Sequence, residues 1–150
     1  MIKLIIFDFG GTIYNPQTHQ LYSGVKEILS KLRDENYQLA LVSKAENSNQ
    51  RFDDFERFQL EKYFKIMEVV SGVRSKNFSH ILKKFKVYSE ECLIVGDYIK
   101  SEIKEGNKIG ATTVRIRNGE FPNILPQTKL ERPDYTIESI SELISLINTI

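Results

Sequence analysis

Acidic, hydroxyl and cationic residues follow four short apolar runs along the chain. They are Asp8-Phe9-Gly10-Gly11-Thr12 after the first run, Ser43-Lys44 after the second, Lys76 after the third, and Gly96-Asp97 with Glu102 after the fourth. Carboxylates are ligands that Mg²⁺ prefers, and hydroxyl and ammonium groups can donate hydrogen bonds to an anion. If the four segments meet in space, they can hold a divalent cation beside an anionic group.

Each of these residues also has an ordinary structural explanation. An Asp after a strand is commonly a turn former, Ser43 can cap the helix that follows it, and Lys76 resembles the solvated lysines further along. These explanations are independent of one another, and they do not account for four polar groups that all follow apolar runs. We therefore interpret the set as one site.

Five short apolar runs, rich in Ile, Val and Leu, predict the strands that must position these residues. They cover residues 2–7, 39–42, 66–70, 92–95 and 113–116. Continuous apolar runs of this kind are typical of strands that are buried on both faces, as in a parallel sheet. The polar residues then stand at the carboxyl ends of the strands.

Helical periodicity appears between these runs. Apolar residues recur at i, i+3, i+4 and i+7 in three segments, which begin at Val25, at Phe78 and at Ile140. A weaker pattern over residues 47–58 predicts a helix that buries Phe52 and Phe55. Each repeat places one apolar stripe on a helix that can cover a face of the sheet. Ser139 and Glu142 predict a capping box for the last helix.

The alternation of strands and helices predicts an α/β fold with a Rossmann-like, doubly wound parallel sheet in three layers, α/β/α. Ligands of such sheets bind beyond the carboxyl ends of the strands, where the polar residues would meet. The length of 150 residues suits a single domain over residues 1–150. We expect residues 118–133, which include several prolines, to form a surface loop.

The composition disfavours several classes of partner. Lys and Arg number 21, and Asp and Glu number 20, so the net charge of +1 creates no field that would gather nucleic acid or an anionic membrane. No apolar run approaches the roughly 20 residues of a membrane-spanning helix. Because Cys92 is the single cysteine and we expect no cleavable leader, we predict a cytoplasmic protein. The oligomeric state stays open.

Four ordered motifs resemble those of the haloacid dehalogenase superfamily, whose members are mostly phosphatases that form an aspartyl-phosphate. Residues 5–12, Ile-Ile-Phe-Asp-Phe-Gly-Gly-Thr, resemble the first motif, and Leu41-Val42-Ser43 resembles the second. Lys76-Asn77 resembles the third motif, and Val95-Gly96-Asp97 through Glu102 resembles the fourth. Residues 22–25 and 132–135 extend the resemblance over nearly the whole chain.

The resemblance implies a Mg²⁺-dependent phosphomonoesterase that acts on a phosphorylated substrate. Asp8 would be the catalytic nucleophile, and Ser43 and Lys76 would donate to the phosphoryl oxygens. The Mg²⁺ ligands would be Asp8, the carbonyl of Gly10, Asp97 and Glu102. The groups that bind the phosphoryl oxygens would come from Gly10, Gly11, Thr12, Ser43, Lys44 and Lys76.

The chain departs from the family at residue 10. The usual first motif has a second Asp there, which protonates the leaving group and then activates water, whereas this chain has Gly10. General acid–base help is worth typically about 10²–10⁴-fold. His19, Tyr14 and Tyr98 are the candidates to replace it, and a plain structural role is the stronger expectation for each. The alternative function is a catalytically weak binding or regulatory module that keeps the fold and the metal site.

The intervals between the first three motifs leave no room for the cap domain that many relatives insert there. An open site suits a large or macromolecular phosphoester, or a substrate that a partner subunit covers. A receiver-type phosphoacceptor domain is disfavoured, because it expects paired acids after the first strand, where this chain has Asp8 alone. Nucleotide binding by a phosphate loop is disfavoured because neither glycine-rich pattern for it is present.

Overall fold

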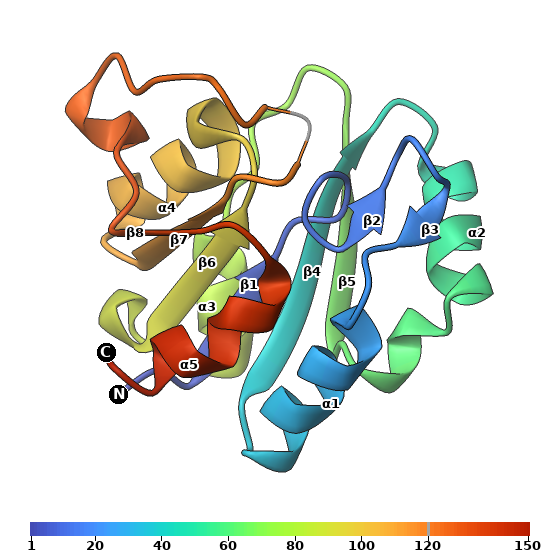
Figure 1. Ribbon diagram of the computed structural model, residues 1–150, viewed down its shortest axis with the longest axis horizontal. Coiled ribbons are helices and arrows are strands. Elements are labelled where there is room, and N and C mark those ends of the chain that lie inside the picture. Colours follow the sequence, from blue (N-terminus) through green and yellow to red (C-terminus); the bar gives the residue numbers. More distant parts are fainter. Residues whose placement is uncertain (120) are drawn as a thin grey trace.

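Six parallel strands form the central sheet of the computed structural model, which describes residues 1–119 and 121–150 (Figure 1). The strands are β1 (Leu4–Phe7), β4 (Gln38–Ala45), β5 (Ile66–Ser71), β6 (Cys92–Gly96), β7 (Thr112–Ile116) and β8 (Tyr135–Ile137). Their order is β5-β4-β1-β6-β7-β8. The chain therefore builds outward from β1 on one side, returns to the other side of β1, and builds outward again. The doubly wound α/β fold predicted from the sequence is confirmed.

Helices cover both faces of the sheet, as a three-layer fold requires. On one face α1 (Val25–Asp34), α2 (Ser48–Arg57) and α5 (Leu143–Ile147) pack with Ile5 and Phe7 of β1. On the other face α3 (Ser79–Phe85) and α4 (Lys104–Ile109) pack with Leu4 and Ile6. This division follows from the strand geometry, because successive side chains of a strand point to opposite faces.

Short helical turns fill several connections. Four are 3₁₀ turns, at Leu60–Lys62, Ser89–Glu91, Lys129–Glu131 and Ile140–Glu142, and one is a π-helical turn, at Ile99–Ile103. The capping box predicted for the last helix is confirmed at the turn that leads into α5, where the side chain of Glu142 accepts the N–H of Ser139 at 3.0 Å. A short hairpin of β2 (Tyr14–Asn15) and β3 (Gln20–Leu21) was not predicted.

One predicted core residue lies at the surface. Phe55 of α2 is buried, as predicted, but Phe52 is 45% exposed. The ring of Phe52 packs edge-on against Phe55 at 5.6 Å, so it covers its neighbour and does not reach the sheet. The prediction that Phe52 is buried is therefore wrong, because the apolar face of α2 is narrower than the sequence pattern indicates.

The connections that follow β1 and β4 contain no inserted domain. Between β1 and β4 the chain forms the β2–β3 hairpin and α1, and between β4 and β5 it forms α2 and one 3₁₀ turn. All residues of these two intervals are described, so the absence of a cap at this edge of the sheet is confirmed. The loop predicted over residues 118–133 contains the 3₁₀ turn Lys129–Glu131, and its residue 120 lies outside the described part of the chain.

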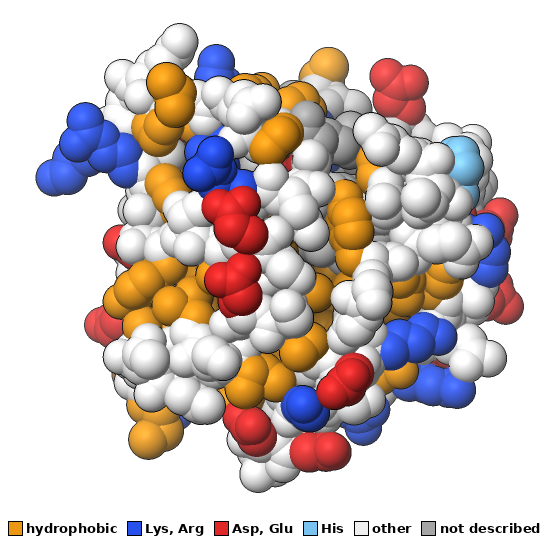
Figure 2. All heavy atoms as spheres, viewed as in Figure 1, with side chains coloured by type: hydrophobic (Ala, Val, Ile, Leu, Met, Phe, Trp, Pro, Cys, Tyr) orange, Lys and Arg blue, Asp and Glu red, His pale blue; other side chains and the backbone are white. Residues whose placement is uncertain are grey.

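Charged side chains of both signs are interspersed over the face shown in Figure 2. This distribution agrees with the net charge of +1. Within residues 1–119 and 121–150, no helix combines the length and the apolar character that crossing a membrane requires.

Candidate active site

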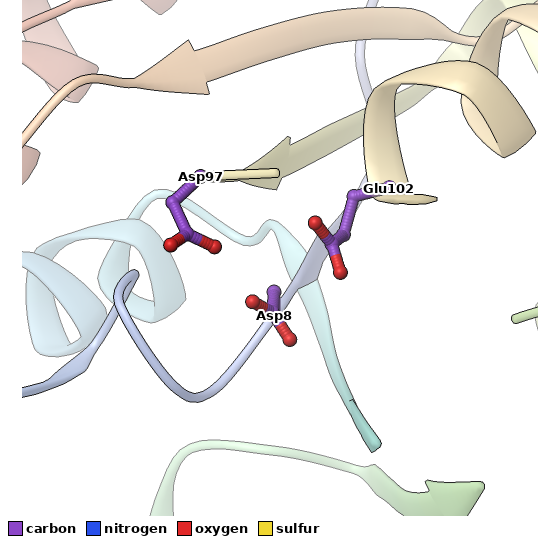
Figure 3. Close-up of side chains that lie close together, drawn as sticks. All are labelled: Asp8, Asp97 and Glu102. Atoms are coloured by element: carbon purple, nitrogen blue, oxygen red, sulfur yellow. The ribbon is translucent and has the colours of Figure 1, made fainter. Parts of the chain in front are cut away.

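Three carboxylates meet at the carboxyl edge of the sheet (Figure 3). Asp8 follows β1, Asp97 follows β6, and Glu102 lies in the π-helical turn after β6. One oxygen of each carboxylate lies within 4.8 Å of the others, and all three side chains are buried. Converging carboxylate oxygens are the donors that a hard divalent cation takes in proteins. The chemistry of these residues therefore fits Mg²⁺.

The sheet itself brings the carboxylates together. Phe7 of β1 lies opposite Val95 of β6, and the N–H of Asp8 donates to the carbonyl of Val95 at 3.0 Å. Gly96 provides the space for Glu102, because a Cβ at position 96 would lie 2.7 Å from the Cβ of Glu102. The parallel pairing and the missing side chain together allow the third acid to fold back over the strand end.

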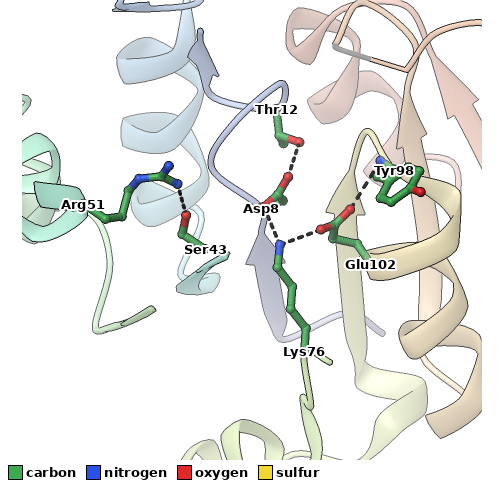
Figure 4. Close-up of polar contacts among 7 residues, drawn as sticks. All are labelled: Asp8, Thr12, Ser43, Arg51, Lys76, Tyr98 and Glu102. Atoms are coloured by element: carbon green, nitrogen blue, oxygen red, sulfur yellow. Dashed lines mark hydrogen bonds and ion pairs between the residues drawn. The ribbon is translucent and has the colours of Figure 1, made fainter. Parts of the chain in front are cut away.

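Lys76 inserts its ammonium group between two of these acids (Figure 4). Its Nζ atom lies 2.5 Å from Oδ1 of Asp8 and 2.5 Å from Oε1 of Glu102. Lys76 lies in the segment before α3. Its side chain is 2% exposed, so it is buried along its whole length. Burying a charged group is costly unless it is paired, and here both carboxylates pair with it.

The protonation states of this cluster depend on one another. Burial alone would lower the pKa of Lys76, but the charges of Asp8 and Glu102 raise it above its ordinary value. Burial and the charge of Asp8 raise the pKa of Glu102, and Lys76 offsets part of that increase. Lys76 therefore remains a cation beside the two carboxyl groups that contact it.

Ser43 and Arg51 lie on the opposite side of Asp8 from Tyr98 (Figure 4). Ser43 is a buried residue of β4, and its Oγ atom accepts a hydrogen bond from Nη1 of Arg51. The guanidinium of Arg51 also stacks over the ring of Phe9, with its Cζ atom 4.8 Å from the ring centroid. Arg51 is a functional candidate that the sequence analysis missed.

A signal for Arg51 existed in the sequence. Asn47 caps α2 by accepting the N–H of Gln50, and only Glu46 separates Asn47 from the end of β4. A connection this short holds the first turns of the helix beside the strand end. The residue one helical turn after the cap, which is Arg51, must then lie close to the site.

A pocket of about 200 Å³ opens above these groups. The predicted site residues that line it are Asp8, Gly10, Ser43, Lys44, Lys76, Asp97 and Glu102. Arg51, Tyr98, Ser101 and Phe121 line it as well. The residues predicted at four separate strand ends therefore share one cavity.

Gly11 and Thr12 use their backbone differently from the prediction. The N–H of Gly11 donates to the carbonyl of Tyr14 at 2.8 Å, and the N–H of Thr12 donates to the carbonyl of Phe9 at 3.2 Å. The hydroxyl of Thr12 donates to Oδ2 of Asp8 at 3.5 Å. Both amides thus close the turn after β1, and Thr12 contacts the carboxylate directly. Gly11 has a φ of 77°, which suits glycine in this turn.

The three candidates to replace the acid at position 10 lie in different places. Tyr98 lines the pocket. Tyr14 and His19 contact one another, with the Tyr14 hydroxyl 3.1 Å from Nδ1 of His19. Neither belongs to the described residues that line the pocket. Tyr14 also stacks on Phe9 at 4.7 Å, so these two residues have the structural role that was expected.

The sequence of the chain matches a known protein family. The chain matches the family described as Haloacid dehalogenase-like hydrolase over residues 15–116. The chain belongs to this family. The Methanopyrus kandleri protein named glyceraldehyde 3-phosphate phosphatase is 27% identical over 131 residues, which are 84% of this chain and 56% of that protein. The chain thus spans about half the length of the curated relatives it matches.

Solved structures share the fold of this haloacid dehalogenase-like chain over almost its full length. A predicted phosphatase from Clostridium acetobutylicum has a TM-score of 0.82 at 14% identity and covers 100% of both chains. The D,D-heptose 1,7-bisphosphate phosphatase from B. bronchiseptica, solved with magnesium and phosphate, has a TM-score of 0.80 at 14% identity and covers 99% of each chain. At such identities the likeness shows the fold alone.

Proposed function

We propose that the chain is a Mg²⁺-dependent phosphomonoesterase that acts through an aspartyl-phosphate on Asp8. The observation that carries this proposal is the pocket in which Asp8, Asp97 and Glu102 converge within 4.8 Å beside Lys76. Family membership and a relative named glyceraldehyde 3-phosphate phosphatase support it. Mg²⁺ held by the three acids and the carbonyl of Gly10 would suppress the repulsion between the Asp8 carboxylate and the phosphate.

The protein groups divide the reaction between them. A carboxylate oxygen of Asp8 forms a bond to phosphorus while the bond to the leaving oxygen breaks on the opposite side. Lys76 and Ser43 donate to the phosphoryl oxygens, where charge develops in the transition state. With Gly10 in place of an acid, the leaving oxygen takes its proton from water. A second water molecule then attacks phosphorus, the bond between phosphorus and the Asp8 oxygen breaks, and the proton that this water loses neutralises the hydroxide left by the first.

Two measurements test this proposal. Release of phosphate from 4-nitrophenyl phosphate reports turnover, and acid quenching followed by hydroxylamine treatment reports a covalent acyl phosphate. We expect a hydroxylamine-sensitive phosphoenzyme that forms faster than it decays. Binding of phosphate esters without turnover would instead support the alternative, a binding or regulatory module that lost the general acid at position 10.

The pocket also bears on the size of the substrate. Its volume of about 200 Å³ accommodates a phosphoryl group and a small leaving group, and this favours a small phosphorylated metabolite. The absence of a cap predicts access for a larger phosphoester. A screen that combines phosphorylated metabolites with phosphopeptides decides between the two, because only one of the sets will show turnover well above that of 4-nitrophenyl phosphate.

Arg51 orients Ser43 in this mechanism. A hydroxyl has one hydrogen to donate and two lone pairs, and Arg51 occupies a lone pair of Ser43, so the hydroxyl hydrogen stays available for a phosphoryl oxygen. We expect Arg51→Met to lower kcat/KM by about 10- to 100-fold, the range for a hydrogen bond to a charged group. In a Ser43→Ala background the same change should cost at most about threefold, because the two residues act through one contact.

Arg57→Met is the matched control for Arg51→Met. Arg57 lies on the same helix, and its guanidinium stacks over Phe58 at 4.3 Å and donates to the carbonyl of His19, as part of the surface. Its replacement should leave kcat/KM unchanged. If the effects of Arg51→Met and Ser43→Ala were fully additive, the orienting role would be wrong.

Gly10→Asp should add the missing proton carrier. Gly11 has a positive φ, but Gly10 is not among the described glycines that do. The backbone conformation at position 10 is therefore one that an Asp residue can adopt. We expect turnover of alkyl phosphates to increase about 10-fold or more. Formation of the phosphoenzyme from 4-nitrophenyl phosphate should change little, since its leaving group departs without a proton. A folded variant, verified by its thermal midpoint, that gains nothing on alkyl phosphates would show that another residue already supplies the proton.

A further inference from the structure

A buried arginine outside the catalytic cluster holds the loop that follows β7. Arg115 is a residue of β7 and is 6% exposed. Its Nη2 atom donates to the carbonyls of Phe121 at 2.9 Å, Ile124 at 2.8 Å and Pro122 at 3.3 Å. Three backbone acceptors around one guanidinium nitrogen fix the path of the loop. Arg115 therefore holds the loop through hydrogen bonds to its backbone.

This loop runs directly against the candidate active site. A Cβ at Gly119 would lie 2.5 Å from the Cβ of Asp97 and 2.5 Å from the carbonyl oxygen of Gly11. Only a residue without a side chain fits there. Phe121 lies on the same loop. Its position is determined by the close approach at Gly119 and by the hydrogen bonds from Arg115.

Phe121 forms an aromatic wall with Tyr98. The two ring centroids lie 4.3 Å apart at an interplanar angle of 30°, and both residues line the pocket that contains Asp8. Phe121 is still 36% exposed. A half-exposed ring at the rim of a polar pocket leaves apolar surface in contact with water, and a ligand with an apolar face would cover it.

The in-line geometry of phosphoryl transfer places the leaving group on the side of the pocket where Tyr98 and Phe121 lie. The leaving oxygen must lie in line with, and opposite to, the attacking oxygen of Asp8. Asp8 is 8% exposed and Phe121 is 36% exposed, so a leaving group opposite Asp8 extends toward the more exposed residues of the pocket. On the side of Ser43 the pocket is lined by the charged residues Arg51 and Lys44, which offer no flat apolar surface. The apolar surface available to the leaving group is the Tyr98–Phe121 wall.

We propose that the Tyr98–Phe121 wall binds the leaving group of the substrate, that Arg115 is the positioning residue that fixes this wall, and that the preferred substrates are phosphate esters with a flat apolar leaving group. This inference rests on the proposed phosphatase function. It assigns the contact with the leaving group to Tyr98 and Phe121 and the placement of Phe121 to Arg115.

Binding of two phosphonates tests the inference without turnover. In benzylphosphonate and ethylphosphonate a CH₂ group replaces the ester oxygen, so neither can be hydrolysed, and they differ in the flat apolar group alone. In calorimetric titrations with Mg²⁺ we expect the wild-type protein to bind benzylphosphonate about 3- to 10-fold more tightly, the range of one aromatic contact. Phe121→Ala should remove most of this preference.

Arg115→Lys tests the positioning role, because a lysine keeps the charge but cannot reach several carbonyls with one planar group. It should also reduce the preference for benzylphosphonate, whereas Leu125→Ala, at a 77% exposed position of the same loop, should retain it. A wild-type protein without a preference, or a Phe121→Ala variant that keeps it, overturns the wall. An Arg115→Lys variant that keeps it overturns the positioning role. Intact preference in a protein without turnover would contradict the phosphatase function alone.

Discussion

Asp8→Asn should abolish phosphate release, with a decrease in kcat of about 10⁴-fold or more, as expected for loss of a nucleophile. Asparagine keeps the shape of the side chain and can still accept the hydrogen bond from Lys76 that Oδ1 of Asp8 accepts. It lacks the negative charge that attacks phosphorus, and it is a poorer ligand for a divalent cation. The acid-quenched variant should therefore contain no covalent phosphate.

The control for Asp8→Asn is the same chemical change at a distant position. Asp53 is an exposed residue of α2, and Asp53→Asn should leave turnover unchanged. The thermal midpoint of Asp8→Asn shows whether the fold survives the loss of one member of the buried cluster. Retention of more than a tenth of the wild-type turnover by the folded variant would rule out attack by Asp8.

Removal of divalent cations should eliminate turnover completely, and Mg²⁺ should restore it. Three acids converge beside Lys76, and converging carboxylate oxygens are ligands that Mg²⁺ takes. A bound Mg²⁺ would stabilise the folded state by mass action. We therefore expect Mg²⁺ to raise the thermal midpoint, which is a result independent of activity.

Asp97→Asn separates the cation site from general salt effects. It removes one of the converging carboxylates, so both the stabilisation by Mg²⁺ and the activation should require a higher Mg²⁺ concentration. Ca²⁺ should inhibit, because its larger and more flexible coordination shell disfavours in-line attack. Full turnover in the presence of chelator would show that the acids serve another purpose.

The sequence predicted the sheet because its signals are local. Strands such as β1 and β6 are continuous apolar runs, and parallel strands must present their carboxyl ends at one edge. That geometry alone predicts that Asp8, Ser43 and Asp97 lie close together. The hairpin after β1 escaped prediction because its strands are two residues long and have no apolar pattern.

The missed residues depend on information that is not local. The position of Arg51 depends on the phase of α2 relative to β4, which a short connection fixes. The position of Phe121 depends on hydrogen bonds from Arg115 to backbone carbonyls of a loop, and no side-chain pattern encodes these acceptors. The N–H of Gly11 donates to Tyr14 in the β2–β3 hairpin, and because this hairpin was missed, the sequence analysis could not identify that partner.

The place of β1 between β4 and β6 also sets the order in which the site can come into being. During synthesis β1 leaves the ribosome before β6, which follows only after α3. Pairing strands that are so distant in the chain is slow, because loop-closure entropy must be overcome before their contacts form. A nascent chain that ends before β6 contains Asp8 but lacks Asp97 and Glu102. The three acids that we propose to hold Mg²⁺ therefore come together only in a late step of folding, when the second half of the sheet docks onto the first.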